Sequence, residues 1–124
     1  MSKRSQLPKL KCALHAKNAG RGPITDVSVL SVSLPFKQSS LNAISLEKVI
    51  IPPAGWSQAT AALSGFSATY VDGDNHVLGI MTFVGLAELA NGTIKIIALI
   101  EFRDNDGQET IQGWVDVLIQ YFIR

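Results

Sequence analysis

The sequence contains very little cysteine, histidine or charge. Cys12 is the only cysteine among 124 residues, so neither an intrachain disulfide nor a thiolate metal cluster can form. Charged residues make up 17 % of the chain, below the roughly 25 % that is typical of globular proteins. Hydrophobic residues make up 47 %. This composition predicts that much of the surface is covered, either in a thick two-layer core or by another copy in a homo-oligomer.

Targeting and membrane signals are also missing. The first eleven residues have no apolar stretch long enough for a signal peptide, and the chain has no run of about 18 apolar residues. We therefore expect a cytoplasmic protein without a membrane span. Cys12 falls on an alternating stretch beside Leu10 and Leu14, which predicts a buried, inert thiol.

Motifs of common enzyme classes are absent. The chain has no nucleophile elbow, no phosphate-binding loop and no dinucleotide fingerprint. His15 and His76 are the only histidines, and neither has a second ligand at the spacing of a zinc site. The sequence thus predicts a protein that is not an enzyme. His76, close to Asp72 and Asp74, is the candidate general base for the alternative, a hydrolase-type activity.

The charges are unevenly distributed along the chain. Residues 1–24 contain six of the eleven lysines and arginines and no acidic residue. This pattern predicts a flexible basic arm over residues 1–9, followed by one domain over residues 10–124. The arm is suited to an acidic surface or to nucleic acid, although no aromatic residues are interleaved with its charges. Nucleic-acid contacts would come from Lys3, Arg4, Lys9 and Lys11.

The C-terminal half alternates between apolar and polar residues in a pattern typical of strands. Turn residues separate the runs, and Asn91-Gly92 predicts a hairpin with a type I′ turn. The last run places Trp114, Leu118 and Phe122 on its outer face, where these side chains need a partner. The predicted strands cover residues 66–70, 77–89, 93–103 and 110–123.

The N-terminal half has weaker patterns. We predict strands over residues 10–16, 25–34 and 44–51, the second ended by Pro35 and the third by Pro52-Pro53. Residues 41–48 also fit a short helix. Residues 54–63 are small and are interpreted as a connection around Trp56.

Seven short strands separated by turn signals, with no convincing helix, predict an all-β fold. The expected architecture is an antiparallel β-sandwich whose last four strands form a consecutive meander. A flattened β-barrel is the alternative.

Successive turns of a meander lie at alternating ends of the sheet. The acidic turns at residues 72–75 and 104–108 are therefore expected to share one rim. The ligand-binding residues predicted there are Asp72, Asp74, Asn75, His76, Asp104 and Asp106. The four aspartates among them are the candidate ligands of a calcium ion, which prefers carboxylate and carbonyl oxygens. Aspartate, asparagine and glycine are equally expected in tight turns that bind nothing.

Three functions are compatible with this fold. The leading hypothesis is a lectin-like, non-catalytic module that works as a homo-oligomer and recognises a carbohydrate or another polar surface group through the acidic rim. The available aromatic platforms are Trp56, Tyr70, Trp114 and Tyr121. A second hypothesis is a structural subunit of a coat-like or sheath-like assembly that uses the basic arm. A third is a small-molecule binder whose site between the sheets is lined by Phe83, Phe102 and Trp114.

Overall fold

A computed structural model describes residues 11–17, 20–39, 43–71, 77–104 and 110–124. These residues form seven strands and no helix. No helix in the described ranges is therefore long and apolar enough to cross a membrane. The strands are β1 (Ala13–His15), β2 (Asp26–Ser39), β3 (Ile44–Ile50), β4 (Trp56–Tyr70), β5 (Val77–Glu88), β6 (Ile94–Asp104) and β7 (Thr110–Ile123).

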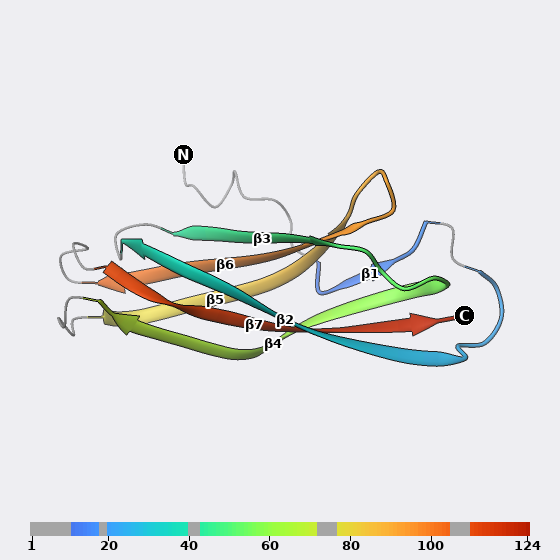
Figure 1. The fold of residues 1–124 in the computed structure, drawn as a ribbon, viewed down its shortest axis with the longest axis horizontal. Helices are drawn as coiled ribbons and strands as arrows, with labels where there is room; N and C mark the ends of the chain where they lie inside the picture. Colours follow the sequence, from blue (N-terminus) through green and yellow to red (C-terminus); the bar gives the residue numbers. More distant parts are fainter. Residues whose placement is uncertain (1–10, 18–19, 40–42, 72–76, 105–109) are drawn as a thin grey trace.

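The strands form two antiparallel sheets that are packed face to face (Figure 1). The four-stranded sheet has the order β1-β4-β7-β2, and the three-stranded sheet has the order β3-β6-β5. This arrangement confirms the all-β, seven-stranded sandwich, and it is not a closed barrel. Residues 44–50 form a strand, which resolves the choice between strand and helix for this part of residues 41–48.

The predicted meander of the last four strands is wrong. Strand β4 pairs with β7, and β5 pairs with β6 in the other sheet. The chain therefore crosses between the sheets after β4 and again after β6. An alternating pattern specifies which side chains are buried, but it does not specify which strand supplies the hydrogen-bonding partner. The three longest strands pair with one another instead: β2, β4 and β7 have 14, 15 and 14 residues.

The core lies between the two sheets and is almost entirely aliphatic. Strand β6 buries one face from Ile94 to Ile100, and β7 buries most of its inner face from the opposite sheet. These are the faces that the alternation in the sequence predicts to be buried. The fully buried side chains on them include Ile94, Ile96, Ala98, Ile100, Val115, Val117 and Ile119.

The connection predicted over residues 54–63 is wrong, because β4 starts at Trp56. Its small residues alternate into the core, where Ser57, Ala59 and Ala61 are buried. Ala59 lies opposite Tyr121 in the ladder between β4 and β7. A small residue at this position leaves space for the large ring. The small side chains are therefore explained by packing against a large neighbour, and they do not indicate a loop.

Pro35 does not end the second strand as predicted. Strand β2 continues to Ser39, and Pro35 lies opposite Trp114 in the ladder with β7. Strand β2 is at the edge of its sheet, and among the described strands its ladder neighbour is β7. Proline is tolerated in such edge strands because the missing N–H disrupts at most one ladder bond.

The hairpin at Asn91-Gly92 is confirmed, but its turn type is not. Gly92 has a φ of 83°, and no described residue other than glycine has a positive φ. A type I′ turn requires two such residues, so this turn is of another type. The Leu89 N–H donates to Thr93 O (2.8 Å) and the Gly92 N–H donates to Leu89 O (3.0 Å). This pattern is typical of a three-residue loop with glycine in the left-handed position.

The N-terminal segment connects the edges of the two sheets. The Leu86 N–H of β5 donates to Lys11 O, and the Ala61 N–H of β4 donates to Cys12 O, both at 2.8 Å. Only three residues of this segment form strand β1, and Leu14 is its buried side chain. Cys12 is exposed, which contradicts the predicted buried thiol. The backbone bends between the two sheets at this residue, so the expected alternation is interrupted.

The last strand is held on both sides. Strand β7 lies between β4 and β2, with ladder pairs to both neighbours along its length. The Thr25 N–H donates to Ile123 O (2.7 Å), and the Arg124 N–H donates to Gly55 O (3.0 Å). The end of the chain is therefore part of the hydrogen-bonded sheet.

Candidate functional site

The strand ends that flank the two acidic turns lie at the same end of the sandwich (Figure 1). Tyr70 pairs with Ile111, and Val77 pairs with Asp104. Strands β5 and β6 form an antiparallel hairpin that starts and finishes at this end of the sandwich, so the two turns share an end although the meander is wrong. The predicted site residues Asp72, Asp74, Asn75, His76 and Asp106 lie outside the described residues.

Asp104 ends strand β6, and only its backbone is described. The calcium site, the acidic rim and the general base at His76 therefore remain predictions. The same is true of the nucleic-acid contacts of Lys3, Arg4 and Lys9, whereas Lys11 is described and exposed. Within the described part of the chain, no three His, Cys, Asp or Glu side chains are placed to hold a metal ion together.

The predicted binding space between the sheets does not have the expected lining. Phe83 and Trp114 are 48 % and 47 % exposed, because both side chains lie on outer faces of the sandwich. The space between the sheets is filled by buried aliphatic side chains instead. The side chain of Phe102 lies outside the described set. The rings of Phe83 and Trp114 therefore lie outside the core, where they are accessible to a ligand.

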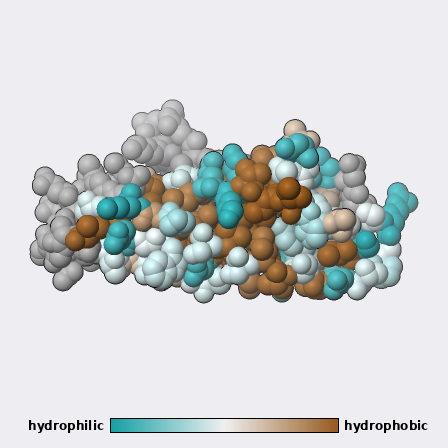
Figure 2. Space-filling view, viewed as in Figure 1, coloured by the Kyte–Doolittle hydropathy of each residue, from teal (hydrophilic) through white to brown (hydrophobic). Residues whose placement is uncertain are grey.

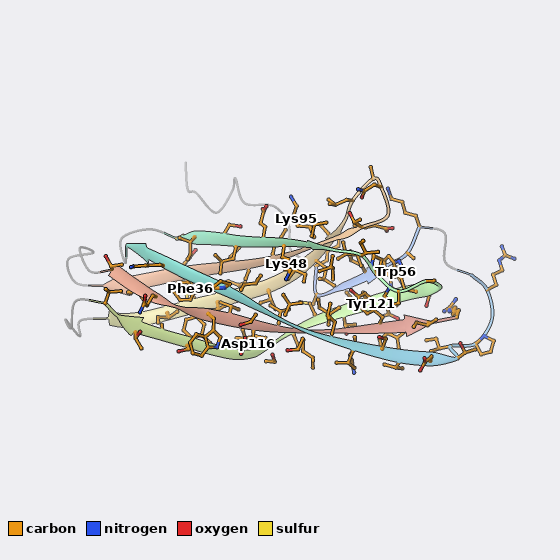
Figure 3. All side chains as sticks on the ribbon, in the orientation of Figure 1. Phe36, Lys48, Trp56, Lys95, Asp116 and Tyr121 are labelled. Atoms are coloured by element: carbon orange, nitrogen blue, oxygen red, sulfur yellow. The ribbon has the colours of Figure 1, made fainter. Side chains whose placement is uncertain are left out.

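Two other rings of the predicted platform have a role in packing. Trp56 packs against the core, and Tyr121 is only 2 % exposed (both are labelled in Figure 3). The Tyr121 hydroxyl is buried, and no described residue is its hydrogen-bond partner. Burial raises the pKa of this hydroxyl, because the phenolate would lose its hydration. Tyr121 is therefore not accessible to a ligand, and Trp56 is only partly accessible.

Trp114 occupies the middle of a polar outer surface on the four-stranded sheet. Its neighbours across the sheet are Pro35 on β2 and Ser67 on β4. Residues that pair in an antiparallel ladder point to the same face, and every second residue shares that face. Three cross-strand rows therefore form one surface, which we call the Trp114 face. Its rows are Lys37-Gln112-Thr69, Pro35-Trp114-Ser67 and Ser33-Asp116-Gly65.

The carboxylate of Asp116 is held in a defined position on this face. The Ser33 hydroxyl donates a hydrogen bond of 2.7 Å to Asp116 Oδ1 (Asp116 is labelled in Figure 3). On the other side of Asp116 lies Gly65, where a Cβ atom would be 2.8 Å from Asp116 Oδ2. Glycine thus leaves the space that this carboxylate oxygen occupies. The register of β4 also shifts between Leu63 and Gly65, as in a β-bulge.

Gly113 brings the backbone of β4 close to the strand that carries Trp114. A Cβ atom at Gly113 would lie 1.8 Å from the carbonyl oxygen of Ser67, which is the ladder neighbour of Trp114. On the inner side, the rings of Phe36 and Phe66 stack with centroids 6.1 Å apart. Trp114 is therefore carried by a backbone that is tightly packed on both sides. Such support is typical of rigid binding surfaces.

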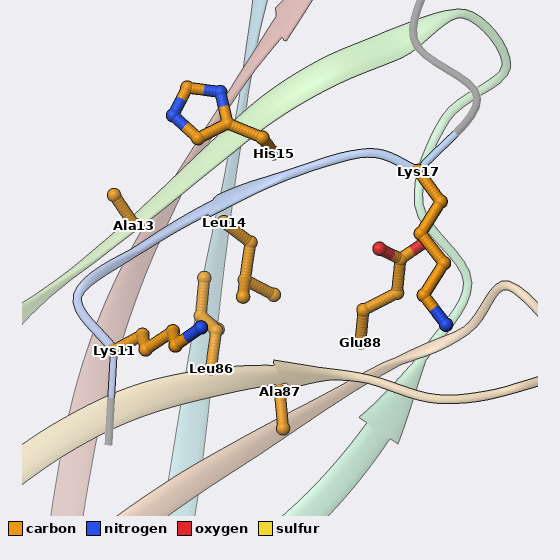
Figure 4. Close-up of a pocket in the computed structure, with 8 residues that line it drawn as sticks. All are labelled: Lys11, Ala13, Leu14, His15, Lys17, Leu86, Ala87 and Glu88. Atoms are coloured by element: carbon orange, nitrogen blue, oxygen red, sulfur yellow. The ribbon is translucent and has the colours of Figure 1, made fainter. Parts of the chain in front are cut away.

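A shallow hollow of about 470 Å³ lies beside the N-terminal segment (Figure 4). Leu14 and Leu86 point toward each other at its base, and Lys17 lies beside Glu88. Two lysines, Lys11 and Lys17, and one acidic residue, Glu88, line it, which suits an anionic group. Sequence reasoning missed this hollow, because nothing local indicates that the N-terminal segment packs beside β5. Its lining residues are Lys11, Ala13, Leu14, His15, Lys17, Leu86, Ala87 and Glu88.

Comparison of the chain with protein-family models, curated proteins and solved structures found no match. The functional reasoning therefore depends on the described residues. Among these, the Trp114 face combines a half-exposed aromatic ring with fixed hydrogen-bonding groups. The sequence did indicate part of it, because the alternation of the last strand places Trp114 on an outer face.

Proposed function

We propose that the protein is a non-catalytic binding module that recognises carbohydrate through the Trp114 face. The single observation that carries this proposal is the exposure of Trp114 between rows of polar residues on the outer face of the four-stranded sheet. An isolated exposed aliphatic residue needs no functional explanation. An exposed indole surrounded by hydrogen-bonding side chains is a more specific arrangement, because it offers both kinds of contact that a sugar makes.

A sugar ring has an apolar face of C–H groups and a rim of hydroxyl groups. The indole of Trp114 supplies a broad apolar platform for the first. The carboxylate of Asp116 accepts hydrogen bonds, and the amide of Gln112 both donates and accepts them. Binding sites for small ligands commonly combine an aromatic surface with a few polar groups that fix orientation. The Trp114 face has this composition, and binding there requires no calcium ion.

The proposal moves the lectin-like site from the loops to the sheet. Trp114 lies near the start of β7, in the half of the sandwich that also holds the ends of β4 and β6. A ligand on the Trp114 face would therefore lie close to the predicted acidic rim. We expect no hydrolysis of the ligand, because the proposed contacts include no general acid with a paired base or nucleophile.

The test is binding to a panel of immobilised oligosaccharides, followed by titration of the strongest binder. Trp114→Ala is expected to weaken this binding by roughly tenfold or more, as truncation of a central aromatic anchor does. Phe83→Ala is the matched control, since Phe83 is equally exposed on the other sheet. Asp116→Asn should weaken binding less, because one acceptor oxygen remains. Unchanged affinity of Trp114→Ala, or equal losses in both ring variants, would overturn the proposal.

A structural subunit of a larger assembly is the second candidate function. The observation that favours it is the exposure of apolar side chains along β2, among them Val27 and Val29. Assembly by this route needs no ligand. Solution mass as a function of protein concentration distinguishes the two, because an assembling subunit grows beyond a closed oligomer and a binding module does not.

A further inference from the structure

We infer that two copies of this chain associate through an apolar patch on the side of the sandwich that β2 and β3 border. A two-fold axis relates the copies, so that each contributes the same patch to the contact. Side chains make this contact, and it requires no pairing between strands of different copies. The inference is independent of the proposed carbohydrate site.

The side between the edge strands β2 and β3 is closed at one end only. Residues 35–37 and residues 43–46 line a common hollow, so the two strands are close together at this closed end. From there they run along the side of the sandwich and diverge (Figure 1). Val32 and Leu34 on the inner face of β2 are each 5 % exposed, whereas Leu30 on the same face is 37 % exposed. The core is therefore uncovered at Leu30, where the strands have separated.

Large apolar side chains are exposed on the open part of this side, and together they form what we call the β2–β3 patch. Figure 2 shows hydrophobic atoms at the surface between the end of β3 and the first half of β2, which Figure 1 locates. The exposed fractions of these residues correspond to roughly 450 Å² of surface, a size at which apolar patches are often functional. The members of the patch are Val27, Val29, Leu30, Val49 and Ile51.

The area of the patch fits a second copy of the chain. A stable dimer buries about 800 Å² on each copy, and about 65 % of a homodimer interface is apolar. The roughly 450 Å² of the patch supplies most of that apolar share. Charged residues make up only 17 % of the sequence, which agrees with a surface that is partly covered in the assembled protein.

Opposite charges lie at the two ends of the patch. Because a strand rises about 3.3 Å per residue, Lys48 lies about 13 Å from the closed end and Asp26 lies about 33 Å from it. Val29 and Ile51 lie near the midpoint, at about 23 Å. A two-fold axis through this midpoint brings Asp26 of each copy next to Lys48 of the other.

Both charged groups are accessible for this contact. Asp26 and Lys48 are exposed, and neither has an ion-pair partner among the described residues (Lys48 is labelled in Figure 3). Asp26 Oδ1 accepts a hydrogen bond of 2.8 Å from the Val27 N–H, which leaves Oδ2 for a cation. Within one copy the two residues lie about 20 Å apart along the side, too far to pair with each other. The charges therefore complement a second copy of the chain.

The first test is the solution mass of the full chain by light scattering and sedimentation. The unchanged protein is expected to be a dimer. Ile51→Lys places a charge at the midpoint of the patch and should reduce the mass by half. Its circular dichroism spectrum should be unchanged, because Ile51 is 86 % exposed and follows β3. Val71→Lys is the matched control, because Val71 is 46 % exposed and follows β4 outside the patch, and this variant should remain a dimer. A monomeric unchanged protein, or a dimeric Ile51→Lys variant, overturns the inference.

The second test exchanges the charges between copies. Asp26→Lys alone and Lys48→Asp alone should each weaken the dimer by roughly tenfold, because like charges then face each other in both contacts. An equal mixture of the two variants should form a heterodimer, since both of its contacts again join opposite charges. A mixture that does not associate, or an unchanged dimer affinity in both single variants, overturns the inference.

The same variants separate this inference from the proposed function. Monomeric Ile51→Lys should bind oligosaccharide at a single site as the unchanged protein does, because Ile51 is not part of the Trp114 face. Trp114→Ala should lose this binding and remain a dimer. A monomeric Trp114→Ala variant would place Trp114 in the contact between copies and would overturn the assignment of that contact to the β2–β3 patch.

Discussion

Replacement of Tyr121 by phenylalanine is expected to stabilise the protein. Tyr121 is 2 % exposed on the inner face of β7, and its hydroxyl has no hydrogen-bond partner in the part of the chain that the structure describes. In the unfolded chain, this hydroxyl is hydrated. Burying a polar group without a partner lowers the free energy of unfolding by about 1–3 kcal/mol, because the group gives up its hydration on folding. Phenylalanine fills the same space without that cost, so we expect the free energy of unfolding to rise by about 1 kcal/mol or more.

The effect is measurable by urea and thermal unfolding. With an unfolding entropy of about 2 cal/mol/K per residue, a gain of 1 kcal/mol raises the melting temperature by roughly 4 °C. If the Tyr121 hydroxyl were hydrogen-bonded, Tyr121→Phe would lower the free energy of unfolding, because its partner would be left unsatisfied. A loss of stability in Tyr121→Phe would therefore show that the hydroxyl is bonded and would refute the reasoning.

The same residue predicts a pH dependence. Burial raises the pKa of Tyr121 in the folded protein above the ordinary value of about 10. The unfolded chain then releases its proton at a lower pH than the folded protein does. The contribution of this residue to stability is complete below pH ~10 and is lost as the pH rises through the folded pKa. Unfolding experiments from pH 8 to 11 should show that Tyr121→Phe removes this part of the alkaline loss.

Three further predictions concern the scaffold. Gly113→Ala should reduce the unfolding free energy by about 3 kcal/mol, because its Cβ would lie 1.8 Å from a carbonyl oxygen of β4. Gly92→Ala should cost only about 1 kcal/mol, since a Cβ there meets nothing within 4 Å and only its φ of 83° is unfavourable; equal losses in urea melts would contradict this. Deleting residues 123–124 should lower the unfolding free energy by roughly 2–4 kcal/mol, because their backbone hydrogen bonds and the half-buried side chain of Ile123 are lost. An unchanged melting temperature would show that these residues do not stabilise the sheet. Lys95→Gln should change stability by less than about 1 kcal/mol at low and high salt, since its 3.5 Å ion pair with Glu47 is solvent-exposed.

Much of the local structure could be predicted from the sequence. The alternating residues of β6 and β7 identified both strands and the faces that are buried, because a strand repeats every two residues. Turn chemistry identified the hairpin before Thr93, since glycine adopts a positive φ without strain. The errors also have local causes. Small residues hid the start of β4, and Pro35 concealed the second half of β2 because its edge position is not visible in the sequence.

The candidate site could be predicted only in part. The outward position of Trp114 follows from the alternation of the last strand. Its neighbours Pro35 and Ser67 come from strands that are far apart in the sequence, and their approach depends on the pairing of β7 with both β2 and β4. No local pattern contains this information.

The sequence by itself therefore determined the class of fold, most of the strands and the side chains that enter the core. These features depend on residue periodicity and on the conformational preferences of single residues. Only the tertiary structure decided which strands are neighbours, that Phe83 lies outside the core, and that β2 is at the edge of its sheet. The physical reason is that strands pair through backbone groups that nearly all residues share. The choice of partner thus depends on how strand lengths and side-chain volumes fit across the whole sandwich.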